Sequence, residues 1–474
     1  MSTATIHPIK PNNKIAIIGS GISGLSCAWL LNQSQDITLY EKDDRLGGHS
    51  NTVSFDLHHQ NIDVDTGFIV FNPLNYPNLV RFLEKLNVES CDTEMSFGMS
   101  INNGELEYSG TGLNGLFAQK RNLMRPKFWS MLYDLNKFYK EAPNFKHVPS
   151  IDEISLGELL KKYHCGNPFI YNHLLPMAAA IWSTPVDKML DYPANCFIRF
   201  CMNHGLLQLN DRPQWKTIIG GSKTYVEKIR IELKDKIRLN THIKSISRHN
   251  GKVMVSNIHG QIEEYDHVVF ACHSDQALKL LSDATQQEND LLSCFPYQKN
   301  QAILHLDTEL MPKRRKVWSS WNYLSSDNKK TEQQVSVSYW MNKLQPLKTE
   351  TPIIVSLNPI KAPSPGSIIR SFFYEHPTFN QSSFSAQKQL WQLQGKQNTW
   401  FCGAYFGYGF HEDGLQSGLA VAEALGGIAR PWSLDNPNNR IYVTPISHAA
   451  INHNTAIKQN LPIPTATDGD ASIV

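Results

Sequence analysis

The pattern of apolar and polar residues predicts a βαβ unit at the start of the chain. Residues 15–18 form an unbroken apolar run, which is typical of a buried parallel strand. Helix-forming residues follow through Leu31, and a second apolar run at 37–40 ends on Glu41.

Further apolar segments predict two sheets. We expect a hairpin of strands at 53–55 and 62–64 and a helix at 76–86. Strands expected to return to the first sheet lie at 237–239, 253–255, 267–271 and 399–404, the last followed by a helix at 415–425. A separate mixed sheet is expected from strands at 301–305, 335–341 and 353–357.

The turn after the first strand carries a nucleotide-binding pattern. Gly19, Gly21 and Gly24 form G-x-G-x-x-G between the strand and the helix. In this pattern the first glycine permits a tight turn, the second lets a pyrophosphate approach the backbone, and the third lets helix pack on strand. The helix N-terminus offers free N–H groups to phosphate, and Glu41 stands at the spacing of a ribose-binding carboxylate. Together these features predict a dinucleotide site.

The composition bounds the function classes. The 474 residues suit two or three domains, and 45 Lys and Arg nearly balance 43 Asp and Glu, which argues against a nucleic-acid partner. The 8 Cys form no C-x-x-C pair, so we expect neither a metal site nor a disulfide framework. No secretory signal or bilayer-spanning segment is evident, which predicts a cytoplasmic protein.

One region leaves membrane contact open. Residues 113–141 are dense in aromatic and cationic side chains. Such a composition is found in helices that dock on anionic lipid. It is also found in cap domains that pack their aromatic residues inward and expose their cations. The sequence does not separate the two readings.

The residues after Glu41 indicate which dinucleotide is bound. Arg45, Gly47, Gly48 and His49 resemble the flavoprotein extension of the motif, in which added N–H groups and a cation meet the FAD pyrophosphate. No second G-x-G-x-x-G unit follows a strand later in the chain, so no dedicated NAD(P)H domain is expected.

The chain as a whole resembles the FAD-dependent amine oxidoreductases, the wider group that contains monoamine oxidases, phytoene desaturases and protoporphyrinogen oxidases. More specifically, it is similar to predicted NAD/FAD-binding proteins found beside, or fused to, cyclopropane fatty acid synthases. The strings that carry this similarity are 47–53, 65–70, 203–207, 212–215, 321–323 and 409–414.

The resemblance implies an α/β fold: a Rossmann-like FAD-binding domain of discontinuous segments with an α+β substrate or cap domain. The FAD-binding segments are expected at 1–75, 211–272 and 399–432. The substrate or cap segments are expected at 76–210 and 273–398, and a flexible tail at 433–474.

The motif and the resemblance together also give candidate site residues. The expected cofactor-binding residues are Gly19, Ser20, Gly21, Ile22, Ser23, Gly24, Glu41, Lys42, Arg45, Gly47, Gly48, His49, Gly67, Phe68, Ile243, Gly403, Glu412, Asp413 and Gly414. The candidates for lining the flavin face are His204, Trp215, Tyr339, Trp340, His376 and His411.

The implied activity is an FAD-dependent oxidation or desaturation of a hydrophobic fatty acyl substrate, with hydride transfer to flavin N5. A second reading is a non-catalytic flavoprotein that serves as a scaffold for a lipid-modifying partner such as a cyclopropane fatty acid synthase. An amine oxidase is a weaker third reading, because the flavin-adjacent lysine typical of amine oxidases is not evident in the sequence.

Overall fold

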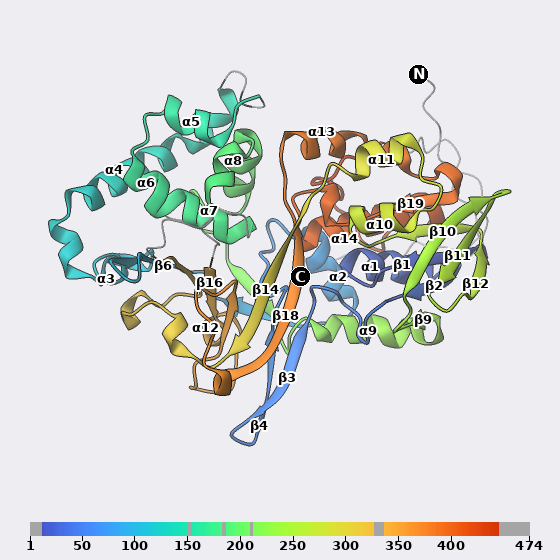
Figure 1. The fold of residues 1–474 in the computed structure, drawn as a ribbon, viewed down its shortest axis with the longest axis horizontal. Coiled ribbons are helices and arrows are strands. Elements are labelled where there is room, and N and C mark those ends of the chain that lie inside the picture. The colour runs from blue at the N-terminus through green and yellow to red at the C-terminus, as the bar shows by residue number, and fades with distance from the viewer. Residues whose placement is uncertain are drawn as a thin grey trace, which may run out of the picture.

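The computed structural model describes residues 12–148, 151, 153–182, 186–208, 212–326 and 336–444. One lobe is built on a five-stranded parallel sheet in the order β19-β13-β1-β2-β9 (Figure 1). The strands are β1 (Lys14–Ile18), β2 (Asp36–Tyr40), β9 (Ile237–Arg238), β13 (His267–Phe270) and β19 (Thr399–Phe401). The predicted βαβ unit and the α/β fold class are confirmed.

Two apolar helices pack closely against each other beside this sheet. These are α1 (Ile22–Leu31), which follows β1, and α14 (His411–Gly426), which follows β19. A Cβ on Gly24 would lie 1.9 Å from the Gly19 carbonyl oxygen, and a Cβ on Gly418 would lie 2.3 Å from that of Ser23. Only glycine therefore permits helix to approach strand, and helix to approach helix, at these points.

A small antiparallel sheet covers one side of the first lobe. It contains β10 (Ile243–His249), β11 (Lys252–Asn257) and β12 (Ile262–Tyr265). The expectation that 253–255 would join the nucleotide sheet was wrong. Val253 and Val255 are buried while the residues between and around them are partly or fully exposed. This period-two pattern suits a strand with one solvated face, whereas β1 is buried along almost its whole length.

The second lobe contains a seven-stranded sheet in the order β18-β14-β17-β16-β15-β6-β7. Its strands are β6 (Phe97–Ile101), β7 (Leu106–Ser109), β14 (Tyr297–His305), β15 (Trp321–Leu324), β16 (Ser336–Trp340), β17 (Ile354–Leu357) and β18 (Ile368–Pro377). Strand β15 runs parallel to β6, and the other pairs are antiparallel. The predicted mixed sheet is confirmed by β14, β16 and β17.

A helical layer caps this sheet and forms the far end of the molecule in Figure 1. Its main helices are α3 (Gly112–Leu116), α4 (Pro126–Glu141), α5 (Leu156–Lys162), α6 (Asn167–Phe169), α7 (Leu175–Trp182) and α8 (Ala194–Asn203), with a 3₁₀ turn η1 (Lys120–Met124) between α3 and α4. None of the helices in the described ranges has both the length and the hydropathy to cross a membrane.

The remaining elements link the lobes or cover the parallel sheet. The predicted hairpin is β3 (Thr52–Leu57) with β4 (Gln60–Asp65), and the predicted helix at 76–86 is α2 (Pro77–Lys85). The others are β5 (Ser90–Thr93), β8 (Trp215–Ile218), α9 (Lys223–Leu233), α10 (Ser274–Leu280), α11 (Gln286–Leu292), α12 (Met341–Leu344) and α13 (Gln381–Leu390).

The chain after Trp432 differs from the expected flexible tail as far as residue 444. Arg440 is buried, and its Nε lies 2.6 Å from Oδ1 of the buried Asp413 on α14. Its Nη1 also donates to the Asn75 carbonyl at 3.1 Å. A buried charge is stable only with a partner, so this pair ties residues 433–444 to the first lobe.

Candidate functional site

A cavity of about 880 Å³ is lined by residues of both lobes. One end lies at the loop between β1 and α1, and the walls continue to strands of the seven-stranded sheet and to helices α7 and α8. Because the carboxyl ends of parallel strands meet at one edge, this is where a doubly wound sheet binds its ligand.

Two glycine loops meet at the first end of the cavity. Gly21, the N-cap of α1, has no side-chain cap, and a Cβ there would meet no atom within 4 Å. Gly48 has a φ of +57°, and its Cβ position lies 3.2 Å from the Gly21 Cα. The loops thus leave open space over an uncapped helix N-terminus, which is an arrangement that binds phosphate.

Glu41 connects these loops. Its carboxylate is almost fully buried, and Oε2 accepts hydrogen bonds from the Ser20 backbone N–H at 2.9 Å and from the Ser20 hydroxyl at 2.5 Å. Oε1 accepts from the backbone N–H of Asp43 at 3.0 Å. Sequence reasoning assigned Glu41 to a ribose and missed this second role of holding the glycine turn.

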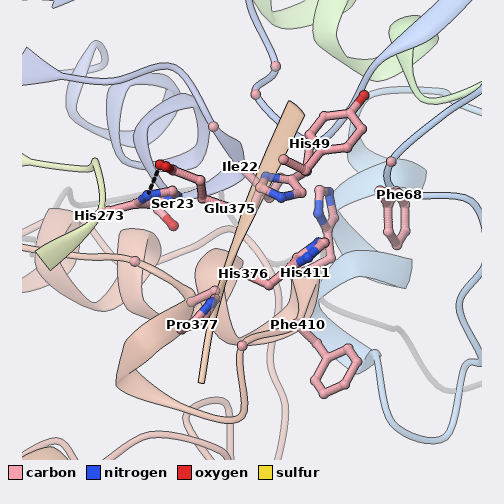
Figure 2. Close-up of a pocket in the computed structure, with 18 of the residues that line it drawn as sticks. Ile22, Ser23, His49, Phe68, His273, Glu375, His376, Pro377, Phe410 and His411 are labelled. Atoms are coloured by element: carbon pink, nitrogen blue, oxygen red, sulfur yellow. Dashed lines mark ion pairs between the residues drawn. The ribbon is translucent and has the colours of Figure 1, made fainter. Parts of the chain in front are cut away.

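Histidine and aromatic rings form the middle of the cavity (Figure 2). The Phe68 and His411 rings stack with centroids 3.8 Å apart, and the His49 and His376 rings lie 5.1 Å apart. Burial lowers the pKa of His411 to about 3 and that of His376 to about 4, and it also lowers the pKa of His49. These rings are therefore neutral near pH 7.

One carboxylate reaches this region from β18. Glu375 Oε2 lies 3.6 Å from Nδ1 of His273, the contact drawn in Figure 2. His273 stacks on Tyr297 with ring centroids 4.3 Å apart. Sequence reasoning missed His273, Tyr297 and Glu375. For Glu375 the sequence did hold a signal. The end of β18 is a run of aromatic and polar residues, whereas a strand with one buried face alternates apolar and polar residues.

The far end of the cavity is mostly apolar. It is lined by Met95, Ile181, Trp182, Phe200, Leu206, Ala302, Trp321, Val355 and Leu357 together with the predicted His204, Trp215 and Tyr339. His204 Nδ1 donates to the Phe200 carbonyl at 2.9 Å, and burial lowers the pKa of His204 to about 3. The imidazole is therefore neutral with its proton on Nδ1.

Most of the predicted cofactor residues line the cavity. The structure places there Gly19, Ser20, Gly21, Ile22, Ser23, Glu41, Lys42, Arg45, Gly47, Gly48, His49, Gly67, Phe68, Ile243 and Gly403, with His204, Trp215, Tyr339, His376 and His411 from the flavin-face candidates. The residues that it leaves outside are Gly24, Trp340, Glu412, Asp413 and Gly414.

The residues outside the cavity have packing roles. Gly24 packs on Gly19, and Trp340 packs edge-on against Trp318 with centroids 5.4 Å apart. A Cβ on Gly414 would lie 2.8 Å from a side-chain carbon of Ile22. These three residues pack behind the side chains that line the cavity and do not line it themselves.

The two acids at the start of α14 likewise differ from expectation. Both Glu412 oxygens face the N-terminus of α2, where they accept from the backbone N–H groups of Asn78 and Leu79, each at 3.0 Å. Asp413 pairs with Arg440. Successive helical residues turn by about 100°, so a helix that points His411 at the cavity turns these carboxylates away from it. The structure gives both side chains a structural role in place of the expected cofactor contact.

The residues present fit FAD. The glycine loops and Arg45 would hold its pyrophosphate, Glu41 its ribose, and the neutral rings beside His411 its flavin. Nε2 of His49 is buried and has no hydrogen-bond partner within the described part of the chain, as expected of a group that awaits a ligand. No cluster of three or more His, Cys, Asp or Glu suited to a metal occurs among those residues.

Comparison with protein families supports a flavin-binding protein. The model of the family described as flavin containing amine oxidoreductase matches residues 22–426, which is most of the chain. Among curated proteins, the flavin-containing amine oxidase A of Sus scrofa is 22% identical over 299 residues, covering 60% of this chain and 54% of that protein. The chain thus spans about half the length of the curated relatives it matches.

Comparison with solved structures shows the same fold. A CLA-producing fatty acid isomerase from P. acnes matches over 86% of this chain and 98% of its own, with a TM-score of 0.60 and 17% identity. Cyclohexylamine oxidase from Brevibacterium oxydans IH-35A matches 88% and 99%, with a TM-score of 0.63 and 14% identity.

Proposed function

Because the chain belongs to the family of flavin-containing amine oxidoreductases, whose cofactor is FAD, we propose that it oxidises or desaturates a long-chain acyl substrate. Bound FAD accepts the two electrons of such a reaction as a hydride. The protein's part is to bind the chain, exclude water and hold the carbons that react.

The single observation that carries this proposal is the neutral, apolar far end of the cavity. Among the described residues that the second lobe contributes to the lining, Glu375 is the one carboxylate, and it already lies beside His273. The lowered pKa values of His204 and His376 keep both rings uncharged. A substrate ammonium would lose its hydration there with little to replace it, whereas an acyl chain loses nothing.

The lysines of the cavity support the same choice. Lys42, Lys279 and Lys299, the lysines that line the described cavity, are all exposed and so lie at its rim. None occupies the buried interior, where the family's amine oxidases would place one. Lys299 Nζ lies 4.4 Å from the centroid of the Phe373 ring, which gives the rim a cation suited to the carboxylate of an acyl chain.

The fold by itself does not select between acyl and amine substrates. One protein that shares it is named a fatty acid isomerase and another an amine oxidase. Both have less than 25% identity to this chain, so the choice rests on the residues of the cavity.

The test is anaerobic reduction of the FAD-loaded protein by a panel of long-chain acyl lipids and amines, followed as loss of flavin absorbance. We expect reduction by an acyl lipid and none by polyamines or aromatic amines. Ala302→Phe, which fills the apolar end from β14, should slow this reduction at least tenfold with FAD content unchanged. Gln301→Phe, one residue away on the opposite face of the strand and outside the cavity, is the matched control.

Two outcomes would overturn the proposal. Reduction by an amine alone would favour an amine oxidase. No reduction by any lipid, combined with stable binding of a lipid-modifying enzyme such as a cyclopropane fatty acid synthase, would favour the scaffold.

A further inference from the structure

Helices α3 and α4 lie in the part of the helical layer farthest from the parallel sheet (Figure 1). Large apolar side chains are exposed there. We define the tip surface as Leu113, Leu123, Met124, Trp129 and Tyr133, which lie on α3, η1 and α4. Their exposed fractions are 74%, 50%, 87%, 49% and 71%. Single exposed apolar residues are ordinary, but five of them within one short segment indicate an interaction site.

Several residues of the tip surface lie close together. Trp129 Nε1 donates to the Leu123 carbonyl at 2.9 Å, and its ring lies 5.7 Å from that of Phe117. The Phe117 N–H in turn donates to the Leu113 carbonyl at 3.0 Å. Tyr133 follows Trp129 by four residues and so lies on the same face of α4.

Buried side chains and hydrogen bonds fix the segment that carries the tip surface. Phe128 and Phe138 of α4 are buried, so the inner face of this helix is committed to the core. Asn122 Nδ2 donates to the Glu107 carbonyl at 3.0 Å, and Arg125 Nη1 donates to the Glu105 carbonyl at 3.0 Å. The inner face of the helix is already filled by Phe128 and Phe138. The outward side chains are therefore exposed in the folded protein.

The segment that carries the tip surface is rich in cations. Residues 112–140 contain six Lys and Arg and a single acid, Asp134, which is buried and accepts the Gly166 N–H at 2.9 Å. Lys120 and Lys127 are exposed and have no ion-pair partner among the described residues. Exposed apolar side chains in the same segment as exposed lysines match an anionic bilayer. The apolar side chains would enter the acyl boundary, and the lysines would meet the headgroups.

We propose that the tip surface docks the protein on anionic membrane lipid. A second copy of the chain fits less well, because a symmetric contact would bring the lysines of both copies together. The proposal does not rest on the proposed function: vesicle binding without lipid oxidation would support the docking and overturn the reaction.

The test uses the FAD-loaded chain of 474 residues and sedimentation with vesicles. We expect binding to vesicles of phosphatidylcholine with phosphatidylglycerol, and at least tenfold weaker binding to phosphatidylcholine alone. Met124→Asp with Tyr133→Asp should reduce binding to the anionic vesicles at least tenfold. Lys120→Glu with Lys127→Glu should remove the preference for them. FAD content and thermal midpoint should not change, since all four side chains are exposed.

The matched control is Ile231→Asp with Ile258→Asp. These residues are 53% and 56% exposed and lie on α9 and after β11, in the other lobe. The control should bind vesicles as the wild type does. Failure of the wild type to bind either vesicle, or equal loss in the control, would overturn the proposal. A wild-type dimer that becomes a monomer in the Met124→Asp/Tyr133→Asp variant without loss of vesicle binding would instead make the tip surface a contact between copies.

Discussion

At the residue scale, two buried carboxylates organise the cavity in different ways. Glu41 holds the glycine turn through Ser20 and lines the cavity where FAD would place its ribose. Asp65, at the end of β4, accepts hydrogen bonds from Thr52, Ser222 and Gln345, and thereby fixes the segment that leads to Gly67 and Phe68. One carboxylate supports the glycine turn, and the other supports the cavity wall.

We expect Glu41→Ala to weaken FAD binding by about 1–3 kcal/mol, because a charged hydrogen-bond acceptor is lost and Ser20 is left without its partner. The measurement is the FAD dissociation constant of the apoprotein, followed by quenching of flavin fluorescence. Asp44→Ala removes a nearby exposed acid that does not line the cavity and should have no effect. A Glu41→Ala dissociation constant equal to that of the wild type would rule out the ribose assignment.

Asp65 makes stability depend on pH. Burial raises its pKa to about 6, whereas in the unfolded chain the value is near 3.8. Its contribution to stability is fully present below pH 4 and is lost as the pH rises through 6, amounting to about 3 kcal/mol. The unfolding free energy of the wild type relative to Asp65→Asn should therefore fall between pH 4 and 7, as measured by denaturant titration. A difference that stays constant with pH would contradict the argument.

At the element scale, the first turn of α14 divides its side chains between two sides. His411 faces the cavity. The Glu412 carboxylate accepts a hydrogen bond from the N-terminus of α2, and the Asp413 carboxylate forms an ion pair with Arg440. The helix thus joins three parts of the chain that are far apart in sequence. The position of α14 at the cavity depends on the contacts of Glu412 and Asp413 as well as on the packing of α14 against α1.

We expect Glu412→Ala to lower the free energy of unfolding by about 1–3 kcal/mol, because two buried N–H groups of α2 lose their acceptor. The FAD dissociation constant should stay within a factor of three, since the side chain does not reach the cavity. Glu412→Gln keeps one acceptor oxygen and should lose less stability. A large loss of FAD affinity at normal stability would restore the cofactor role that the sequence suggested.

At the scale of the whole molecule, the described chain contains one sheet of the dinucleotide-binding kind. The second large sheet is mainly antiparallel and carries no glycine loop of this type. Residues of both lobes instead line one cavity of about 880 Å³, so FAD and the proposed substrate would share one space.

It follows that NADPH should reduce the bound flavin slowly. Stopped-flow mixing under anaerobic conditions is expected to show no rapid stoichiometric bleaching by NADPH or NADH. Dithionite serves as the control that the flavin can be reduced. Rapid reduction by a nicotinamide cofactor would instead indicate a reductase.

The sequence by itself determined the first βαβ unit and the glycine loops, and it predicted the acid Glu41 beside them. These depend on local backbone freedom and on short spacings, because Gly19 and Gly21 act within a few residues of where they stand. The hairpin predicted at 53–55 and 62–64, the strands of the parallel sheet and three strands of the seven-stranded sheet (β14, β16 and β17) were found for the same reason, since their periodicity is a local property.

Only the tertiary structure decided which side chains meet. Four histidines from distant segments meet at the cavity: His49, His273, His376 and His411. Burial leaves these rings neutral, and the local sequence around each histidine does not indicate this. The direction of Glu412 likewise depends on how α14 is rotated against α2. Long-range packing sets these outcomes.

The aromatic residues of 113–141 show the same division. Their composition suited both an inward-packing cap and a lipid-docking surface. The fold divides them, burying Phe128 and Phe138 and leaving Trp129 and Tyr133 in solvent. Burial depends on which neighbours cover a side chain, so the sequence set the chemistry of this segment and the tertiary structure decided which residues face out.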